Sequence, residues 1–381
     1  MKIAFDAQLL MKGEKTGIGW CAENILKMMP QYNKHDYQLD CFTLGYTAEQ
    51  LANVEKYSQI GYKINKCTWF HDVIYRMMWN FFSVPYSMFF GMSADVTLFF
   101  NYVIPPGVKG KKITFVYDMA YKAHPETVRI KTRELLNIAL KKSCKRADHI
   151  ITISEFSKSE IIKYLDIPED KISIMPCGVD SLLYHPNYSE QDVKTVINKY
   201  QIQGEYLLYL GTLEPRKNIE RLIQAFTLLK KEIPNIPKLV LAGRKGWMYE
   251  SIFEMVKSLH MENDIIFTGY IDYKDAPILI KGAKIFLFPS IYEGFGMPPL
   301  EAMASGTAVI VSNVSSLPEV VGDAGILVNP FSVDSIKEGI KLLVNDDDKR
   351  SELSRMGIER AKTYTWDNAA KVVQKVIQNL I

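Results

Sequence analysis

Two glutamates, Glu293 and Glu301, bracket a loop with two glycines in the string EGFGMPPLE. The apolar run at 285–288 before this loop predicts a buried parallel strand, and Pro298 with Pro299 fits the first turn of a helix. A strand, a glycine loop and a helix N-terminus can direct backbone N–H groups and the positive end of the helix dipole at an anion. Two flanking carboxylates could hold hydroxyl groups beside a phosphate, although an acid early in a helix can also serve only to offset the dipole.

Two cations, Arg216 and Lys217, follow a second predicted strand at 206–210 and the glycine loop at 211–215. We expect them at the start of an amphipathic helix over 219–231. Cations at that end oppose the helix dipole, so this local conflict indicates a bound anion. A diphosphate leaving group fits, because arginine offers a planar fork of donors and lysine a point charge. The alternative is a pair of solvated cations.

The strings GTLEPRKN and EGFGMPPLE together closely resemble the signature of retaining glycosyltransferases of family 4, which use sugar nucleotides. The resemblance covers residues 206–328 well and the first half of the chain loosely. It implies that Glu293 contacts the transferred sugar, that Glu301 binds the nucleotide ribose, and that Arg216 and Lys217 carry the leaving diphosphate. The other donor-binding residues that it implies are Gly17, Thr212, Ile271, Gly294, Phe295, Gly296 and Leu300.

The acceptor side is expected in the first half of the chain. Asp118 follows a predicted strand over 112–117, and ligands bind at the carboxyl ends of strands in open α/β sheets. The family commonly has His-Asp here, so Asp118 matches as a catalytic residue, while Tyr117 replaces the histidine and suggests a different acceptor. We assign Tyr117 and His124 to the acceptor side, although a lone histidine is often structural or solvated. The glycine loop 12–19, which contains Gly17, predicts a phosphate-binding unit between a strand and a helix. The alternative is a tight turn that binds nothing.

Composition is that of an ordinary soluble protein. The 381 residues predict two domains, and 48% hydrophobic with 23% charged residues is typical of globular chains. A net charge of +3 gives no nucleic-acid footprint. Five dispersed cysteines without a CxxC pair argue against a disulfide framework or zinc site and for a reducing compartment. No signal peptide or spanning helix is expected, so we predict a cytoplasmic protein.

Three further stretches have competing interpretations. The segment 69–101 is rich in aromatic and methionine residues but is interrupted by Asn80. It predicts either an amphipathic face that touches lipid, with Arg76 nearby, or a core helix and a strand at 96–100. The basic helix expected at 127–147 favours a solvated face, near anionic lipid in one interpretation. The acidic triplet 346–348 resembles a metal-binding DxD, but helix capping or a solvated loop is favoured.

The resemblance implies an α/β fold of two Rossmann-like domains facing across a cleft (GT-B). We predict an acceptor-side domain over residues 1–185 and a nucleotide-sugar-binding domain over residues 186–365. A final helix over residues 366–381 is expected to pack back on the first domain. The predicted reaction moves a mannose-, glucose- or rhamnose-type hexose, with retention, from a nucleotide-diphosphate sugar to a glycan or lipid-linked acceptor in bacterial surface polysaccharide synthesis. We expect no metal or other cofactor, no nucleic-acid partner, and peripheral contact of the first domain with the inner face of the membrane. The alternatives are a nucleotide-sugar epimerase and a non-catalytic nucleotide-sugar-binding protein.

Overall fold

The computed structural model describes residues 1–11, 17–32, 35–78, 84–91 and 94–381. The chain forms two compact units, Met1–Gly178 with Trp366–Ile381, and Val179–Thr365. Residues 179–185, which were expected to end the first domain, pack with the second unit. Val179 pairs with Thr365 in a short bridge, and the hydroxyl of Tyr184 hydrogen bonds with Glu301.

The first unit is built on a seven-stranded parallel sheet in the order β3-β2-β1-β4-β5-β6-β7. This is the doubly wound arrangement, in which the winding direction reverses between β1 and β4. Central strands such as VTLF of β4 are entirely buried, as expected for a parallel sheet covered on both faces. The strands are β1 (Lys2–Asp6), β2 (Asp36–Phe42), β3 (Lys63–Cys67), β4 (Val96–Phe99), β5 (Lys111–Phe115), β6 (His149–Thr152) and β7 (Ile172–Ile174).

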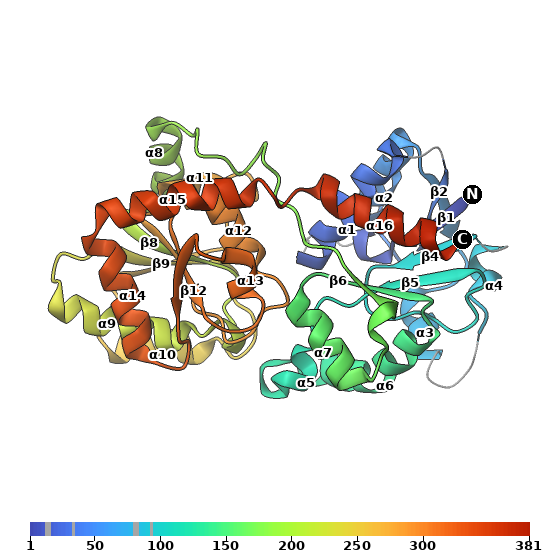
Figure 1. The fold of residues 1–381 in the computed structure, drawn as a ribbon, viewed down its shortest axis with the longest axis horizontal. Helices are drawn as coiled ribbons and strands as arrows, with labels where there is room; N and C mark the ends of the chain where they lie inside the picture. Colours follow the sequence, from blue (N-terminus) through green and yellow to red (C-terminus); the bar gives the residue numbers. More distant parts are fainter. Residues whose placement is uncertain (12–16, 33–34, 79–83, 92–93) are drawn as a thin grey trace. The chain divides into compact units, whose positions relative to one another are not determined.

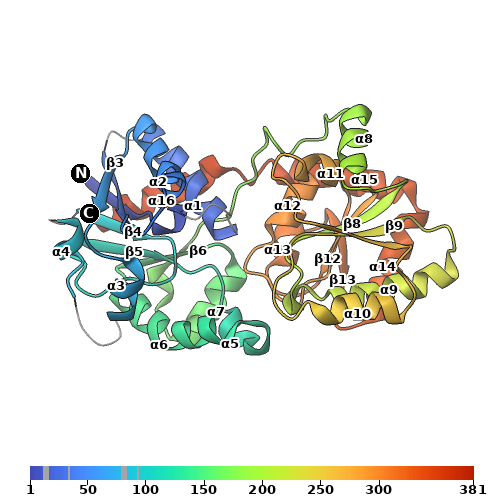
Figure 2. The same cartoon turned by 180° about the vertical axis from the view of Figure 1, so that it is seen from behind.

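Helices cover both faces of this sheet (Figures 1 and 2). They are α1 (Gly17–Met28), α2 (Ala48–Glu55), α3 (Asp72–Met78), α4 (Ser87–Phe90), α5 (Ala120–Ala123), α6 (Ile130–Arg146), α7 (Glu155–Leu165) and α16 (Trp366–Leu380). The 3-10 turns are Gln8–Met11, Met29–Gln31, Lys56–Ile60, Pro125–Thr127 and Glu169–Lys171. The final helix α16 packs on α1, as predicted. Its Gln374 amide donates to the Tyr37 hydroxyl at 3.0 Å.

The aromatic segment 69–101 forms α3, α4 and β4, which confirms the core helix and the strand. Contact with lipid stays a prediction, and Asn80 lies outside the described residues. Tyr75, Phe89 and Phe90 are buried in the core together with residues of α6 and α7. In contrast, Val73 and Met77 on the outer side of α3 are each more than half exposed. One side of α3 therefore belongs to the core and the other is apolar surface.

The second unit has a six-stranded parallel sheet in the order β10-β9-β8-β11-β12-β13. Its strands are β8 (Tyr206–Leu210), β9 (Lys238–Ala242), β10 (Ile265–Gly269), β11 (Ile285–Phe288), β12 (Val309–Ser312) and β13 (Gly325–Val328). Its helices are α8 (Glu190–Lys199), α9 (Ile219–Glu232), α10 (Glu250–Ser258), α11 (Ala276–Gly282), α12 (Met297–Ala304), α13 (Leu317–Val321), α14 (Val333–Asn345) and α15 (Asp347–Ala361), with a 3-10 turn at Pro215–Lys217. The winding reverses between β8 and β11, the point at which ligands bind in such sheets.

Helix α8 of the second unit was not expected, whereas the cap of helix α15 was. The polar stretch 181–205 is typical of a linker, but it contains helix α8, which begins with a capping box of Ser189 and Asp192. Val196 is the one buried residue of α8, so the helix gives little hydrophobic periodicity. Asp346 caps α15 by accepting from the Lys349 amide at 2.8 Å, which confirms the capping interpretation of the acidic triplet. No helix of the described residues is long and apolar enough to cross a membrane.

Candidate active site

The site in the second unit is formed by the loops that follow β8 and β11, which are neighbours in the sheet. The Ile291 amide donates to the Arg216 carbonyl at 2.9 Å. The Asn218 side chain donates to the carbonyls of Pro289 and Pro330 at 2.9 and 2.7 Å. Asn218 has φ +60°, a left-handed conformation that asparagine tolerates better than most residues. These bonds fix the two loops against each other.

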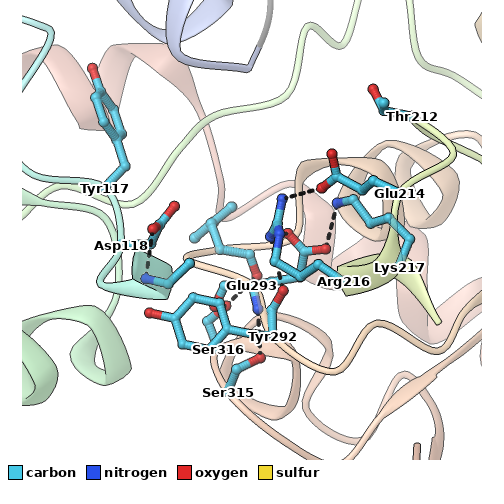
Figure 3. A network of polar contacts seen from close by, with 12 residues as sticks. Tyr117, Asp118, Thr212, Glu214, Arg216, Lys217, Tyr292, Glu293, Ser315 and Ser316 are labelled. Carbon is cyan, nitrogen blue, oxygen red and sulfur yellow. Dashed lines mark hydrogen bonds and ion pairs between the residues drawn. The ribbon is translucent and has the colours of Figure 1, made fainter. Parts of the chain in front are cut away.

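Arg216 lies between two carboxylates, as Figure 3 shows. Its guanidinium donates to Glu293 Oε2 at 2.9 Å and to Glu214 Oε1 at 3.0 Å. Lys217 Nζ lies 2.6 Å from the other oxygen of Glu293. All four side chains are at most 19% exposed. Two cations and two anions thus form a compact buried ion network.

The charge of Glu293 is set by this network. Burial alone would raise the pKa of Glu293, but the adjacent charges of Arg216 and Lys217 outweigh burial and hold the pKa below its ordinary value. Glu293 is therefore ionised at neutral pH. It can accept hydrogen bonds from hydroxyl groups while it orients both cations.

The sequence predicted both cations at the start of a helix, but in the structure they precede helix α9. Arg216 and Lys217 belong to the 3-10 turn at Pro215–Lys217, and α9 begins at Ile219. Their opposition to the helix dipole is relieved within the chain by Glu214 and Glu293. The dipole conflict is thus compensated within the chain, and the binding of an anion by Arg216 and Lys217 stays a prediction.

The EGFG loop is held from the β12 side of the sheet. The Glu293 amide donates to Ser315 Oγ at 3.0 Å. The Ser316 hydroxyl lies 2.9 and 2.7 Å from the carbonyl oxygens of Glu293 and Phe295. Gly296 has φ +115°, and a Cβ there would lie 2.7 Å from Leu317 Cδ2. This position therefore requires glycine, and the loop has a defined shape.

The amide donors near α12 come from the loop, because Pro298 and Pro299 in the first turn carry no N–H. Phe295 is buried and its ring packs edge-on against Tyr364, with centroids 5.7 Å apart. Its side chain is therefore occupied in packing. A contact of Phe295 with a ligand would have to come from its backbone.

Glu301 lies in the second turn of α12, not in the first as expected. Its carboxyl is hydrogen bonded to the Tyr184 hydroxyl, and burial raises the pKa of Glu301 to about 8 despite this bond. Asp180 and Tyr273 lie close enough to Tyr184 to interact with its hydroxyl electrostatically. The carboxyl is thus largely protonated at neutral pH in the absence of a ligand.

The other predicted donor-binding residues are placed as follows. Thr212 is half-exposed in the loop after β8, and its carbonyl accepts from the Tyr209 hydroxyl at 3.0 Å. Ile271 follows β10 and is buried. Leu300 is 1% exposed in the core. In the first unit, Gly17 is the exposed first residue of α1, and nothing lies within 4 Å of an added Cβ. The rest of its loop, 12–16, lies outside the described residues.

The predicted acceptor residues of the first unit follow β5. Asp118 is half-buried and accepts from the Ala120 amide at 3.0 Å (Figure 3). The Tyr117 ring is 4% exposed and its hydroxyl is buried near Cys21 and Cys177. The structure therefore places Tyr117 in the core and not on an acceptor surface. His124 is near the surface, with Nδ1 3.3 Å from Glu126 Oε1.

Sequence reasoning did not assign roles to four residues that shape the site, namely Glu214, Asn218, Ser315 and Ser316. For Glu214 a signal existed, since an acid two positions before an arginine in a glycine loop can pair with it. The serines lie more than 20 positions from the loop that they hold. Nothing local marks such a pairing.

Comparison with known proteins identifies the family. A model described as "Glycosyltransferase Family 4" matches residues 24–181, and one described as "Glycosyl transferases group 1" matches residues 192–360. The O-antigen chain mannosyltransferase B of Escherichia coli is 38% identical over 70% of this chain and 70% of its own length. The chain belongs to glycosyltransferase family 4. This confirms the resemblance and the prediction of a glycosyltransferase.

Other relatives of this family 4 glycosyltransferase are more distant or longer. The serotype-specific mannosyltransferase WbdA of Escherichia coli is 35% identical over 59% of this chain, which spans only 28% of WbdA. The structure of HepE from Anabaena with UDP and glucose has a TM-score of 0.73 at 17% identity, covering 100% of this chain and 99% of HepE. WaaG, a glycosyltransferase involved in lipopolysaccharide biosynthesis, has a TM-score of 0.69 at 15% identity, covering 98% and 99%. These structures confirm the two-domain GT-B fold.

Proposed function

We propose that this glycosyltransferase moves a mannose-type hexose from a nucleoside-diphosphate sugar to a hydroxyl of a bacterial surface polysaccharide, with retention of configuration. The observation that carries the donor assignment is the buried network of Arg216, Lys217 and Glu293 at the reversal point of the second sheet. The names of the O-antigen mannosyltransferase relatives support the choice of sugar and product.

In the proposed reaction the bond between the anomeric carbon and the diphosphate oxygen breaks, and the acceptor oxygen bonds to the same face of that carbon. The acceptor proton passes to the departing diphosphate, so a nucleoside diphosphate is the second product. Arg216 and Lys217 stabilise the negative charge that develops on the leaving group. Ionised Glu293 accepts from sugar hydroxyls and keeps both cations in place. We propose that two fixed cations make a divalent metal unnecessary.

We also propose that the first unit contacts the membrane that carries the acceptor. Trp69, Val73, Ile74 and Met77 are each more than half exposed. Helix α6 adds exposed lysines at 131, 141, 142 and 145, and apolar side chains beside cations favour an anionic lipid surface. Flotation with vesicles of phosphatidylglycerol and phosphatidylcholine tests this. Binding that needs the anionic lipid and is lost in Val73→Ser/Met77→Ser supports it, and equal recovery with neutral vesicles contradicts it.

The donor assignment is tested with GDP, UDP and dTDP and their mannose, glucose and rhamnose derivatives, all in EDTA. We expect one nucleoside diphosphate at 100 times its Kd to stabilise the protein by about 2.7 kcal/mol. The matching nucleotide mannose should then support transfer to a mannose-terminated oligosaccharide, and NMR of the product gives the anomeric configuration.

Each part of the proposal has its own contrary result. Transfer of glucose or rhamnose instead of mannose would overturn the sugar assignment, and an inverted anomer would overturn retention. Stabilisation or transfer that appears only with added Mg²⁺ or Mn²⁺ would overturn the metal-free mechanism. Lys230→Ala is the matched control for variants of Arg216 and Lys217. Lys230 lies on α9, outside the site, and its Nζ is 2.7 Å from Asp264 Oδ1. The activity of Lys230→Ala should equal that of the unmodified protein.

A further inference from the structure

A second polar cluster lies at the carboxyl edge of the first sheet. Its members are the last residue of β1 and residues that follow the neighbouring parallel strands β2 and β3, so they gather at one edge. We call it the β1–β3 edge cluster; it consists of Asp6, Tyr46, His71, Asp72 and Arg76. None of these residues was assigned a role in donor or acceptor binding above.

The contacts within this cluster are defined. Arg76 Nη2 lies 3.6 Å from Asp72 Oδ2. The rings of Tyr46 and His71 are stacked, with centroids 6.3 Å apart and planes at 25°. Gly45 has φ +83°, and a Cβ there would lie 2.9 Å from His71 Nε2, so the imidazole rests on bare backbone. Asp6 is close enough for Arg76 and Asp72 to act on it electrostatically.

One atom of the cluster has no hydrogen-bond donor among the described residues. Asp72 is 5% exposed, and its Oδ1 is buried without a partner. His71 Nδ1 lies 3.2 Å from this oxygen, but it accepts the Val73 amide at 3.2 Å and so does not donate to Asp72. Buried polar atoms are nearly always satisfied, and an orphaned acceptor costs stability. A hydroxyl group of a ligand would supply the missing donor.

The chemistry of the cluster selects the kind of ligand. Two carboxylates face one guanidinium, so the cluster repels phosphate and uronate groups and favours neutral molecules with several hydroxyls. The half-exposed Tyr46–His71 pair offers an aromatic face against which the C–H face of a sugar ring can pack. A buried acid that fixes orientation, beside an aromatic surface, is typical of a specific small-molecule site.

We propose that the β1–β3 edge cluster binds a neutral sugar residue of the acceptor, with sugar hydroxyls donating to Asp72 and Asp6. This inference rests on the proposed function and specifies its acceptor side. The outer surface of the same helix carries exposed Val73, Ile74 and Met77, which fits an acceptor that presents its glycan next to a lipid.

The test is steady-state transfer to a neutral mannose oligosaccharide by full-length Asp72→Asn and Tyr46→Phe. Asparagine keeps an acceptor oxygen but removes the charge that strengthens the hydrogen bond, so we expect the acceptor KM of Asp72→Asn to rise about 5- to 10-fold. Donor KM and the acceptor-independent hydrolysis of the donor should stay unchanged. Tyr46→Phe, a milder change that keeps the ring, should raise acceptor KM several-fold.

Asp148→Asn is the matched control. Asp148 is a partly buried aspartate of the same sheet that accepts from the Lys112 amide at 2.8 Å, but it precedes β6 and so lies at the opposite edge. Its acceptor KM should not change. A uronate-terminated oligosaccharide should bind the unmodified protein at least tenfold more weakly than the neutral one.

The outcomes separate this inference from the proposed function. If the unmodified protein neither binds a nucleoside diphosphate nor hydrolyses the donor, the proposed function itself is wrong. If it does both, but Asp72→Asn and Tyr46→Phe keep the original acceptor KM, the subsite is overturned. A fall in thermal stability and donor affinity of Asp72→Asn with an unchanged acceptor KM shows a purely structural role and also overturns it.

Discussion

Replacing Arg216 by alanine should damage the protein in two separable ways. The first is electrostatic, since the Glu214 carboxylate, only 5% exposed, loses the guanidinium 3.0 Å away. Breaking a buried ion pair by removing one partner costs about 3–5 kcal/mol. For a unit of this size each kcal/mol lowers the midpoint of thermal unfolding by about 2–4 °C, so a loss of about 10 °C is expected. The second is chemical, because the leaving diphosphate loses a charged donor.

The variant Glu214→Gln separates the two effects. Glutamine keeps an acceptor for Arg216 but removes the charge, so by itself it should cost only about 1–2 kcal/mol. In the double variant Arg216→Ala/Glu214→Gln no carboxylate is orphaned at position 214. About 1.5–3 kcal/mol of the loss should therefore be recovered, within the usual range for residues in direct contact.

The assays are thermal unfolding and single-turnover transfer at saturating donor. We expect the double variant to regain stability while kcat stays about 100- to 1,000-fold below that of the unmodified enzyme, since a preorganised donor to the leaving group is missing. Recovery of kcat together with stability would refute the diphosphate role and leave Arg216 as a structural residue. Lys230→Ala, which removes a partly exposed cation of the following helix α9, should cost at most about 1 kcal/mol and leave kcat unchanged.

Three further predictions concern pH and backbone geometry. Burial raises the pKa of Asp40 to about 6, above its value of 3.8 in the unfolded chain. The free energy of unfolding should therefore fall as pH rises from 4 to 6, by roughly 2–3 kcal/mol in total. Thermal unfolding of Asp40→Asn should show no such dependence on pH, and a dependence that persists would contradict the assignment. Nucleoside diphosphate affinity should rise as pH increases through about 8, where Glu301 ionises, and calorimetry on Glu301→Gln should show no such rise; identical profiles would exclude Glu301 as the titrating group. Gly296→Ala should cost roughly 1–3 kcal/mol because of its φ of +115°, whereas Gly17→Ala should not alter stability, and an equally unstable Gly17→Ala would contradict the open space around that residue.

Much of the fold was predictable because its signals are local. Buried runs such as Ile285–Phe288 and Tyr206–Leu210 form strands with the predicted bounds. The prolines at 298 and 299 lie in the first turn of α12, as expected. In contrast, β13 was missed because a run of only four residues, GILV, does not by itself distinguish a strand from a loop or a helix. Helix α8 was missed because it buries little. Elements that depend on weak local signals become visible only when their neighbours are in place.

The sequence by itself determined which residues could carry out the chemistry, namely a glutamate in a glycine loop and an arginine and lysine after a strand. Only the tertiary structure decided how they are paired. Glu293 meets Arg216 across 77 positions of chain, because the crossover brings β11 beside β8 in the sheet. The burial of Tyr117 and the bond between Tyr184 and Glu301 were likewise decided by packing. Charge balance and protonation depend on which groups share a buried volume, and that is a property of chain topology, which no local pattern of residues contains.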